Sequence, residues 1–150
     1  MWRGKLPHWR ADDVTYYVTF RHRRALTEDE RRLLLRSLLR AEGRRWVLQI
    51  VCVLPEQTEM LFSVCKTLSG HSYELADVVE ASKRKTGNAI IKKTGERWSP
   101  FYEESFDRIV RDENELVERW QAIFESPVGQ GLVEDEEEYE FLWVSEATDL

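Results

Sequence analysis

Two side chains that could bind a metal, Gln57 and Glu59, lie two residues apart beside an apolar stretch. The segment 47–64 contains two apolar, β-branched runs separated by the polar break 55–59, which predicts a pair of strands joined by a turn. Residues two apart on a strand project from the same face. An amide oxygen and a carboxylate are hard ligands of the kind that magnesium or manganese prefers, although two are too few for a dedicated site. An ordinary turn with solvated polar residues is the alternative explanation.

The elements before this hairpin must supply the rest of a sheet and a helix to cover it. Alternation over 14–21 predicts a first strand with Tyr16, Val18 and Phe20 on one face. Thr27 and Glu30 form a capping-box pattern at the start of a helix that runs to about residue 41. Its leucines recur at helical spacing and form the expected buried stripe: Leu34, Leu35, Leu38 and Leu39.

Two more helices and two more strand candidates follow the hairpin. A helix is expected over 73–93, with a division at 87–88 as one option, and a fourth strand over 104–110. A third helix is expected to start in the acidic segment 112–115 and to end at Pro127. The segment 139–144 alternates and is either a last strand or an interface tail.

Length and composition indicate one globular domain over residues 1–133, followed by an acidic tail over 134–150. No apolar run reaches the roughly 20 residues needed to span a bilayer, and the basic start lacks the apolar core of a signal peptide. Cys52 and Cys65 are interpreted as reduced thiols, which predicts a cytoplasmic protein. Their spacing, with three scattered histidines, fits no zinc pattern.

The charge is strongly segregated along the chain. Residues 1–45 contain 12 Lys and Arg against 6 Asp and Glu, whereas residues 98–150 contain 3 against 16, within a total of −6. An acidic total argues against indiscriminate binding of nucleic acid, but a basic half is compatible with a local phosphate-binding face. Solvated helix surfaces are the equally weighted alternative.

Four segments, in order, resemble the REP-associated tyrosine transposases of the HUH superfamily, which cut single-stranded DNA. Residues 53–61 resemble that family's Met-Pro-Asn-His-x-His-Leu-Leu segment, and residues 16–21 its Tyr-Phe-Val-Thr-Phe-Arg strand. Residues 98–113 are similar to Trp-Gln-x-x-Tyr-x-Asp-Arg-x-x-Arg-x-Glu. Residues 123–133 are similar to the end of Tyr-Ile-x-x-Asn-Pro-Val-Lys-x-Gly-Leu-Val. The resemblance covers roughly residues 6–133 and implies an α+β, ferredoxin-like fold, an antiparallel sheet of four or five strands with helices packed on it.

The resemblance also implies where a catalytic centre would lie. The family's two histidines hold a divalent metal, its tyrosine attacks DNA, and its asparagine before proline helps to hold the metal. Those positions are Gln57 and Glu59, Ala122, and Ser126 here. Because alanine offers no nucleophile and all four positions differ, we expect that the scaffold is retained and catalysis is lost. No cofactor is expected with certainty, and magnesium or manganese only if some activity survives.

Three functional hypotheses follow: a domain that binds hairpin-forming single-stranded DNA without cutting it, an active transposase with a variant metal site, and a protein-interaction module. A homodimer is compatible with the resemblance, and no membrane partner is expected. The first hypothesis assigns basic and aromatic residues to DNA contact, and Lys83 is matched to a lysine in the corresponding helix of the family. These residues are Arg3, Trp9, Arg10, Arg21, Arg23, Arg24, Lys83, Arg84, Lys85, Lys92 and Lys93.

Overall fold

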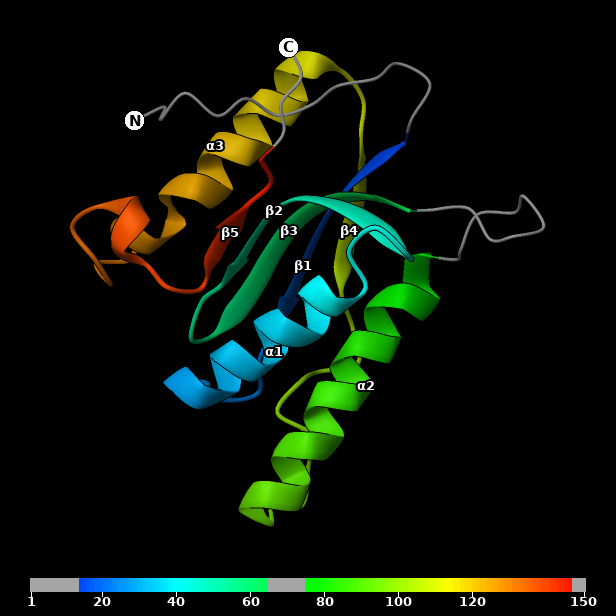
Figure 1. Cartoon of the computed structure of the whole chain (residues 1–150), viewed down its shortest axis with the longest axis vertical. Helices are drawn as coiled ribbons and strands as arrows, with labels where there is room; N and C mark the ends of the chain where they lie inside the picture. The colour runs from blue at the N-terminus through cyan, green and yellow to red at the C-terminus, as the bar shows by residue number, and fades with distance from the viewer. Residues whose placement is uncertain (1–13, 65–74, 147–150) are drawn as a thin grey trace.

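The computed structural model describes residues 14–64 and 75–146 (Figure 1). The elements are β1 (Thr15–Arg21), α1 (Glu28–Arg40), β2 (Trp46–Val53), β3 (Gln57–Val64), α2 (Leu75–Thr94), β4 (Phe106–Val110), α3 (Glu113–Gly129), the short 3-10 helix η1 (Glu136–Glu138) and β5 (Leu142–Val144). None of the helices in these ranges is long and apolar enough to cross a membrane. The predicted DNA contacts Arg3, Trp9 and Arg10, and also Cys65, lie outside the described residues.

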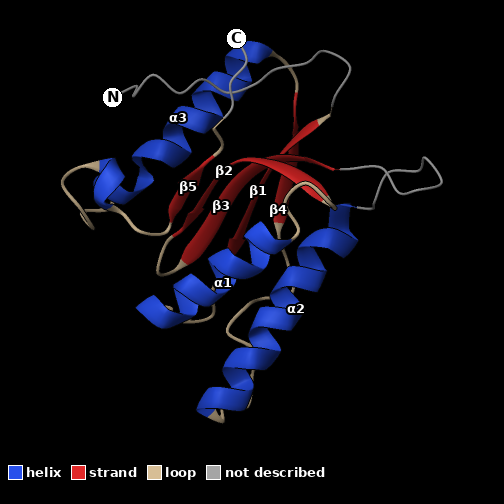
Figure 2. Ribbon diagram, in the orientation of Figure 1, coloured by secondary structure: helices blue, strands red, loops and turns tan. Residues whose placement is uncertain are grey.

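The strands form one antiparallel sheet in the order β4-β1-β3-β2-β5, which confirms the predicted α+β class. Helices α1 and α2 lie side by side on one face, and α3 lies on the other (Figures 1 and 2). The alternation predicted for the first strand is confirmed, since Val18 and Phe20 are fully buried. Because β1 pairs with β3 in register, Thr19 stands opposite Glu59 and Tyr17 opposite Leu61.

The helix layer is attached to the sheet by an apolar core and by a local capping motif. Leu34 and Leu38 of α1 are buried, and Trp46 donates its indole N–H to the carbonyl oxygen of Leu38 at 3.0 Å. The capping box is present: the Thr27 hydroxyl accepts from the Glu30 backbone, and the Glu30 carboxylate accepts from the Thr27 backbone. Such a cap satisfies donors that the first helical turn leaves unpaired.

The predicted end of the third helix at Pro127 is wrong, because α3 continues to Gly129. A proline removes one helical N–H, but the turn that follows closes on other carbonyl groups. The backbone N–H groups of Gln130 and Leu132 donate to the carbonyls of Ser126 and Pro127, both at 2.9 Å. Similarly, α2 is one continuous helix of 20 residues and is not divided at 87–88.

Of the two alternatives for residues 139–144, the last strand is confirmed, and this part of the segment after residue 134 contributes to the sheet and core. Strand β5 pairs with β2, and Tyr139 and Phe141 are buried. The Tyr139 hydroxyl donates to the carbonyl oxygen of Val53 at 2.7 Å. Aromatic side chains inserted every second residue anchor this stretch.

Truncating Phe141 should therefore destabilise the whole domain. We expect Phe141→Ala to lower the free energy of unfolding by about 3–5 kcal/mol, because it removes a buried aromatic ring. Urea unfolding followed by circular dichroism measures the change. Leu132→Ala, at an exposed position nearby in sequence, is the control and should change it by less than about 0.5 kcal/mol. A Phe141 variant as stable as the Leu132 control would show that the segment 139–144 is not part of the cooperative unit.

Candidate functional site

The side chains at positions 57, 59 and 126 meet between the sheet and α3. Gln57 donates its amide N–H to Oε2 of Glu59 at 2.6 Å, and the Ser126 hydroxyl donates to Oε1 of Glu59 at 2.6 Å. Residues two apart on β3 share a face, as predicted, and α3 brings Ser126 to that face from 67 positions along the chain. The same hydroxyl lies 3.0 Å from the carbonyl oxygen of Ala122, one turn earlier on α3.

Glu59 is a buried carboxyl group, with 8 % of its surface exposed. Burial raises its pKa above the ordinary value, while the hydrogen bonds from Ser126 and Gln57 act in the opposite direction. Cys52 of β2 pairs with Glu59 across the two strands and is also buried. Its burial, and to a smaller extent the charge of Glu59, raises the pKa of the Cys52 thiol. Cys52 is therefore a protonated core residue and not a reactive thiolate.

These residues do not fit a divalent metal. Both Glu59 oxygens already accept a hydrogen bond, and Gln57 presents its N–H group, which cannot be a ligand, to the carboxylate. Residues 14–64 and 75–146 contain no cluster of three His, Cys, Asp or Glu side chains suited to a metal ion. The three side chains satisfy one another, so the arrangement closes the position with protein hydrogen bonds.

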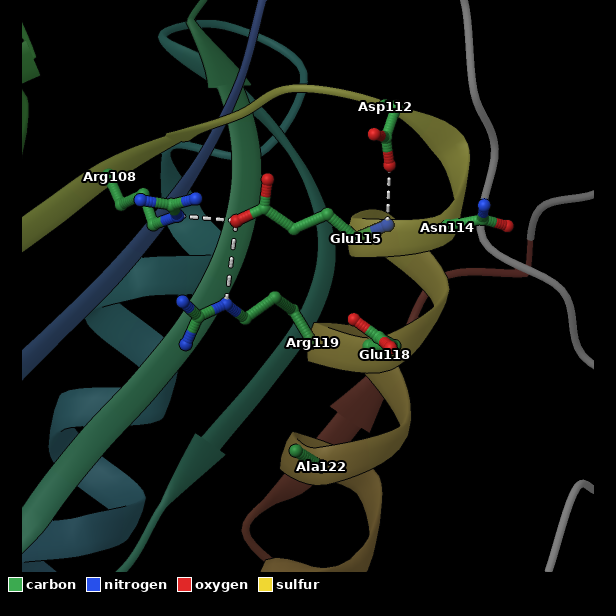
Figure 3. Close-up of a pocket in the computed structure, with 7 residues that line it drawn as sticks. All are labelled: Arg108, Asp112, Asn114, Glu115, Glu118, Arg119 and Ala122. Atoms are coloured by element: carbon green, nitrogen blue, oxygen red, sulfur yellow. Dashed lines mark hydrogen bonds and ion pairs between the residues drawn. The ribbon is translucent and has the colours of Figure 1, made fainter.

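The position aligned with the family's nucleophile, Ala122, is exposed and lines a surface hollow of about 550 Å³ (Figure 3). Glu115 organises this hollow: its carboxylate pairs with Arg108 of β4 and lies 3.8 Å from Arg119 of α3. These arginines are thus engaged with the protein. The ion pair between Arg108 and Glu115 thus joins β4 to α3. The hollow also has Asp112 and Glu118 in its lining, so its charge does not favour a phosphate.

A tyrosine is present beside the site, but on β1. Tyr17 lies under the guanidinium of Arg119, at 4.3 Å from the ring centroid. Burial, and then the charge of Glu59, raise its pKa, against the effect of Arg119. A tyrosine nucleophile needs the opposite shift, toward the phenolate, so Tyr17 is poorly suited to replace the missing one.

Lys83, the lysine matched to the family's helix residue, is buried and holds the chain before β4. Its ammonium group donates to the carbonyl oxygens of Glu103 and Glu104 at 3.1 and 3.3 Å and to the Ser105 hydroxyl at 3.2 Å. It is 4 % exposed and pairs with Glu80 at 3.2 Å. All its donors therefore have protein partners, and the predicted DNA contact is not available to Lys83 in this conformation.

The other predicted basic residues divide into engaged and open groups. Arg24 bridges Glu30 at 2.7 Å and Glu96 at 2.6 Å, so its guanidinium group is engaged with protein carboxylates. Arg21 and Arg23 are exposed at the end of β1. On α2, the solvent-facing row 84, 85, 88, 89, 92 and 93 is exposed throughout. We call its four cations the α2 stripe: Arg84, Lys85, Lys92 and Lys93.

Sequence reasoning placed 57, 59 and 126 in one site but missed Tyr17, Glu115 and Arg119. The alternation that buried Val18 and Phe20 left Tyr17 on the opposite face, which was an available signal. The register of β1 against β3 and the rotation of α3 decide which side chains meet. Neither quantity can be read from one sequence.

The buried carboxyl makes stability depend on pH. Because folding raises the pKa of Glu59, the folded chain binds this proton more tightly than the unfolded chain does. The stability that this tighter proton binding adds is fully present below pH 4.5, the ordinary pKa of a glutamate side chain. It is lost as pH rises through the raised pKa of Glu59. Glu59→Gln cannot ionise, so its stability relative to wild type should increase from pH 4.5 toward neutrality. Urea unfolding over that range tests this, and parallel pH profiles would contradict it.

Lys83 should act as a structural residue. We expect Lys83→Met to lower the free energy of unfolding by about 1–3 kcal/mol, because the carbonyls it caps lose their donor. The matched control is Lys85→Met on the exposed row, for which a change below about 0.5 kcal/mol is expected. Denaturant unfolding of both variants measures the difference. A Lys83 variant as stable as the control would disprove the role.

No protein-family model and no curated relative matches this chain. Among solved structures, a REP-associated tyrosine transposase bound to a REP hairpin is similar, with a TM-score of 0.70 and 14% identity over 99% of this chain and 95% of that one. A candidate transposase from Deinococcus radiodurans R1 gives a TM-score of 0.51 and 15% identity, over 82% of this chain and 95% of that one. At such identities the likeness concerns the fold. The chain therefore has a transposase-like fold over almost its whole length.

Proposed function

We propose that this protein binds hairpin-forming single-stranded DNA and does not cut it. The likeness to a transposase bound to a REP hairpin supports the choice of ligand, because it extends over 99% of the chain. The observation that carries the binding is the α2 stripe. The absence of cleavage is supported by the hydrogen bonds from Gln57 and Ser126, which occupy both carboxylate oxygens of Glu59.

The α2 stripe provides four cations on one exposed helix surface. From residue 84 to residue 93 it extends over about 13 Å of helix. Within residues 14–64 and 75–146, none of the four forms an ion pair, and no acidic side chain interrupts the row. Such a surface attracts the phosphate backbone, and binding releases the counterions of the nucleic acid.

The opposite face is unsuited to the same ligand. Helix α3 has four acidic residues and one basic residue, and the acidic segment 134–138 follows it. Nucleic acid approaching Ala122 would thus meet excess negative charge. The charge distribution separates the surface that would bind DNA from the position of the former nucleophile.

Cleavage through the family's route would need a metal, ligands and a phenolate. Here Glu59 is satisfied by Gln57 and Ser126, and position 122 has no hydroxyl. Restoring one of these components would leave the others missing. We therefore assign the site between β3 and α3 to stability.

A binding titration with a DNA hairpin at low and at moderate salt tests the interaction. We expect saturable binding that weakens with salt and prefers the hairpin to duplex DNA. The double variant Lys92→Gln/Lys93→Gln should reduce affinity and flatten the salt dependence by about 0.7–0.9 log units per log unit of salt for each lost phosphate contact. The charge-matched control is Arg36→Gln/Arg40→Gln on the exposed surface of α1. Equal losses in both variants would contradict a specific role of the stripe, and no binding by wild type would overturn the proposal.

Incubation of the wild-type protein with the same hairpin and manganese tests the absence of cleavage. We expect intact DNA and no covalent adduct on denaturing gels, because position 122 offers no nucleophile and the Glu59 cluster offers no open ligand set. A DNA–protein adduct would show that another residue attacks. Repeating the assay with Tyr17→Phe would identify or exclude the tyrosine nearest the site.

A further inference from the structure

We infer that the loop after α2 contains a site for one unpaired nucleotide, formed by Trp98, Arg97, Arg23 and Tyr102. This inference rests on the proposed function and adds to it a position where a base is bound. The α2 stripe would hold the backbone and this site would hold a base.

Trp98 is the most exposed of the large apolar side chains, at 64 % of its surface within the described residues. The guanidinium carbon of Arg97 lies 5.3 Å from the centroid of its ring, and that of Arg23 lies 4.7 Å from the centroid of Tyr102. Two aromatic rings, each beside a guanidinium, thus lie on one short segment. Aromatic rings stack on any base, and arginine pairs with the adjoining phosphate.

The loop that presents these groups is firmly attached at several points. The backbone N–H of Arg23 donates to the carbonyl of Pro100 at 2.6 Å, and its side-chain Nε donates to the carbonyl of Ser99 at 3.0 Å. Phe101 is buried and packs edge-on against Phe20. Exposure of Trp98 is therefore a property of an ordered loop, which lowers the entropy that binding would have to overcome.

Glycine at position 87 permits this attachment to α2. A Cβ atom placed there would lie 2.7 Å from the Ser99 hydroxyl, so a larger residue would force this hydroxyl away from the position in which it accepts a hydrogen bond from the Phe101 backbone N–H at 3.2 Å. The single Gly95 then ends the helix with a φ of +78°, a conformation that glycine adopts readily. Gly87 and Gly95 thus both help to place the segment that contains Trp98.

A surface hollow of about 300 Å³ lies at this position, with Arg23, Arg97 and Trp98 in its lining. Its acidic member, Glu96, is paired with Arg24 on both carboxylate oxygens, and this pairing lowers the pKa of Glu96 to about 2. Within the described part of the chain, Arg97 forms no ion pair. It lies four residues after Lys93, the last residue of the α2 stripe. The chemistry is therefore apolar, aromatic and cationic, and it suits a base with its phosphate.

Binding of three DNA probes by wild type and variants tests the site. The probes are a blunt hairpin, the same hairpin with a short unpaired extension, and an unstructured single strand. We expect wild type to prefer the extended hairpin to the blunt one. Trp98→Ala should weaken binding of the extended hairpin and the single strand by about 5- to 150-fold and leave the blunt hairpin almost unchanged. Trp98→Phe should retain most of the affinity, because a ring remains.

The control variant is Ile109→Ala, which removes another exposed apolar side chain. If Trp98→Ala binds every probe as Ile109→Ala does, the nucleotide site is disproved while hairpin binding stands. If wild type binds the single strand but neither hairpin, the proposed function fails, and loss of that binding in Trp98→Ala would uphold the site. Absence of binding to all three probes would overturn both.

Discussion

A carboxyl group buried between a sheet and a helix requires hydrogen-bond donors, and Glu59 obtains them from Gln57 and Ser126. This cluster joins β3 to α3 and determines how the helix sits on the sheet at that point. A metal would need the same oxygens that now accept these hydrogen bonds. The hydrogen bonds that join β3 to α3 thus also occupy the oxygens that a metal at this position would need.

The two faces of the sheet differ in charge in a way that follows from this arrangement. The face covered by α3 combines the closed cluster with an acidic helix, and its arginines are engaged with Glu115. On the other side of the sheet, α2 presents uninterrupted cations toward solvent. Under the proposed function, DNA would contact the cationic surface of α2 and would not approach the acidic surface around α3.

Much of the fold could be predicted from the sequence because its signals are local. The Val47–Val64 hairpin, the capping box at Thr27 and the alternation of β1 each depend on neighbouring residues. The predicted helix end at Pro127 was wrong, and the strand at the end of the chain could be predicted only as one of two alternatives, because contacts distant in sequence decide the structure there. Tyr139, for example, is held by a carbonyl on β2 that lies 86 residues away.

The candidate site was predictable in its positions but not in its interactions. The resemblance grouped positions 57, 59, 122 and 126. The side chains at 57, 59 and 126 do form one hydrogen-bonded cluster, and Ala122 lies one helical turn from Ser126. The burial of Lys83 and the choice of Glu115 as the partner of Arg108 depend on how α2 and α3 pack. Side-chain type alone could not separate a lysine that caps carbonyls from one that meets phosphate.

The most direct measurement of the central claim is an NMR map of backbone amide shifts as a DNA hairpin is added to the labelled protein. The account predicts that the largest shifts fall on α2 between residues 84 and 93 and on the loop 96–102, with α3 and the strand around Glu59 almost unchanged. Shifts concentrated on Tyr17, Glu59 and α3 would contradict it, because they would place the DNA on the opposite face of the sheet.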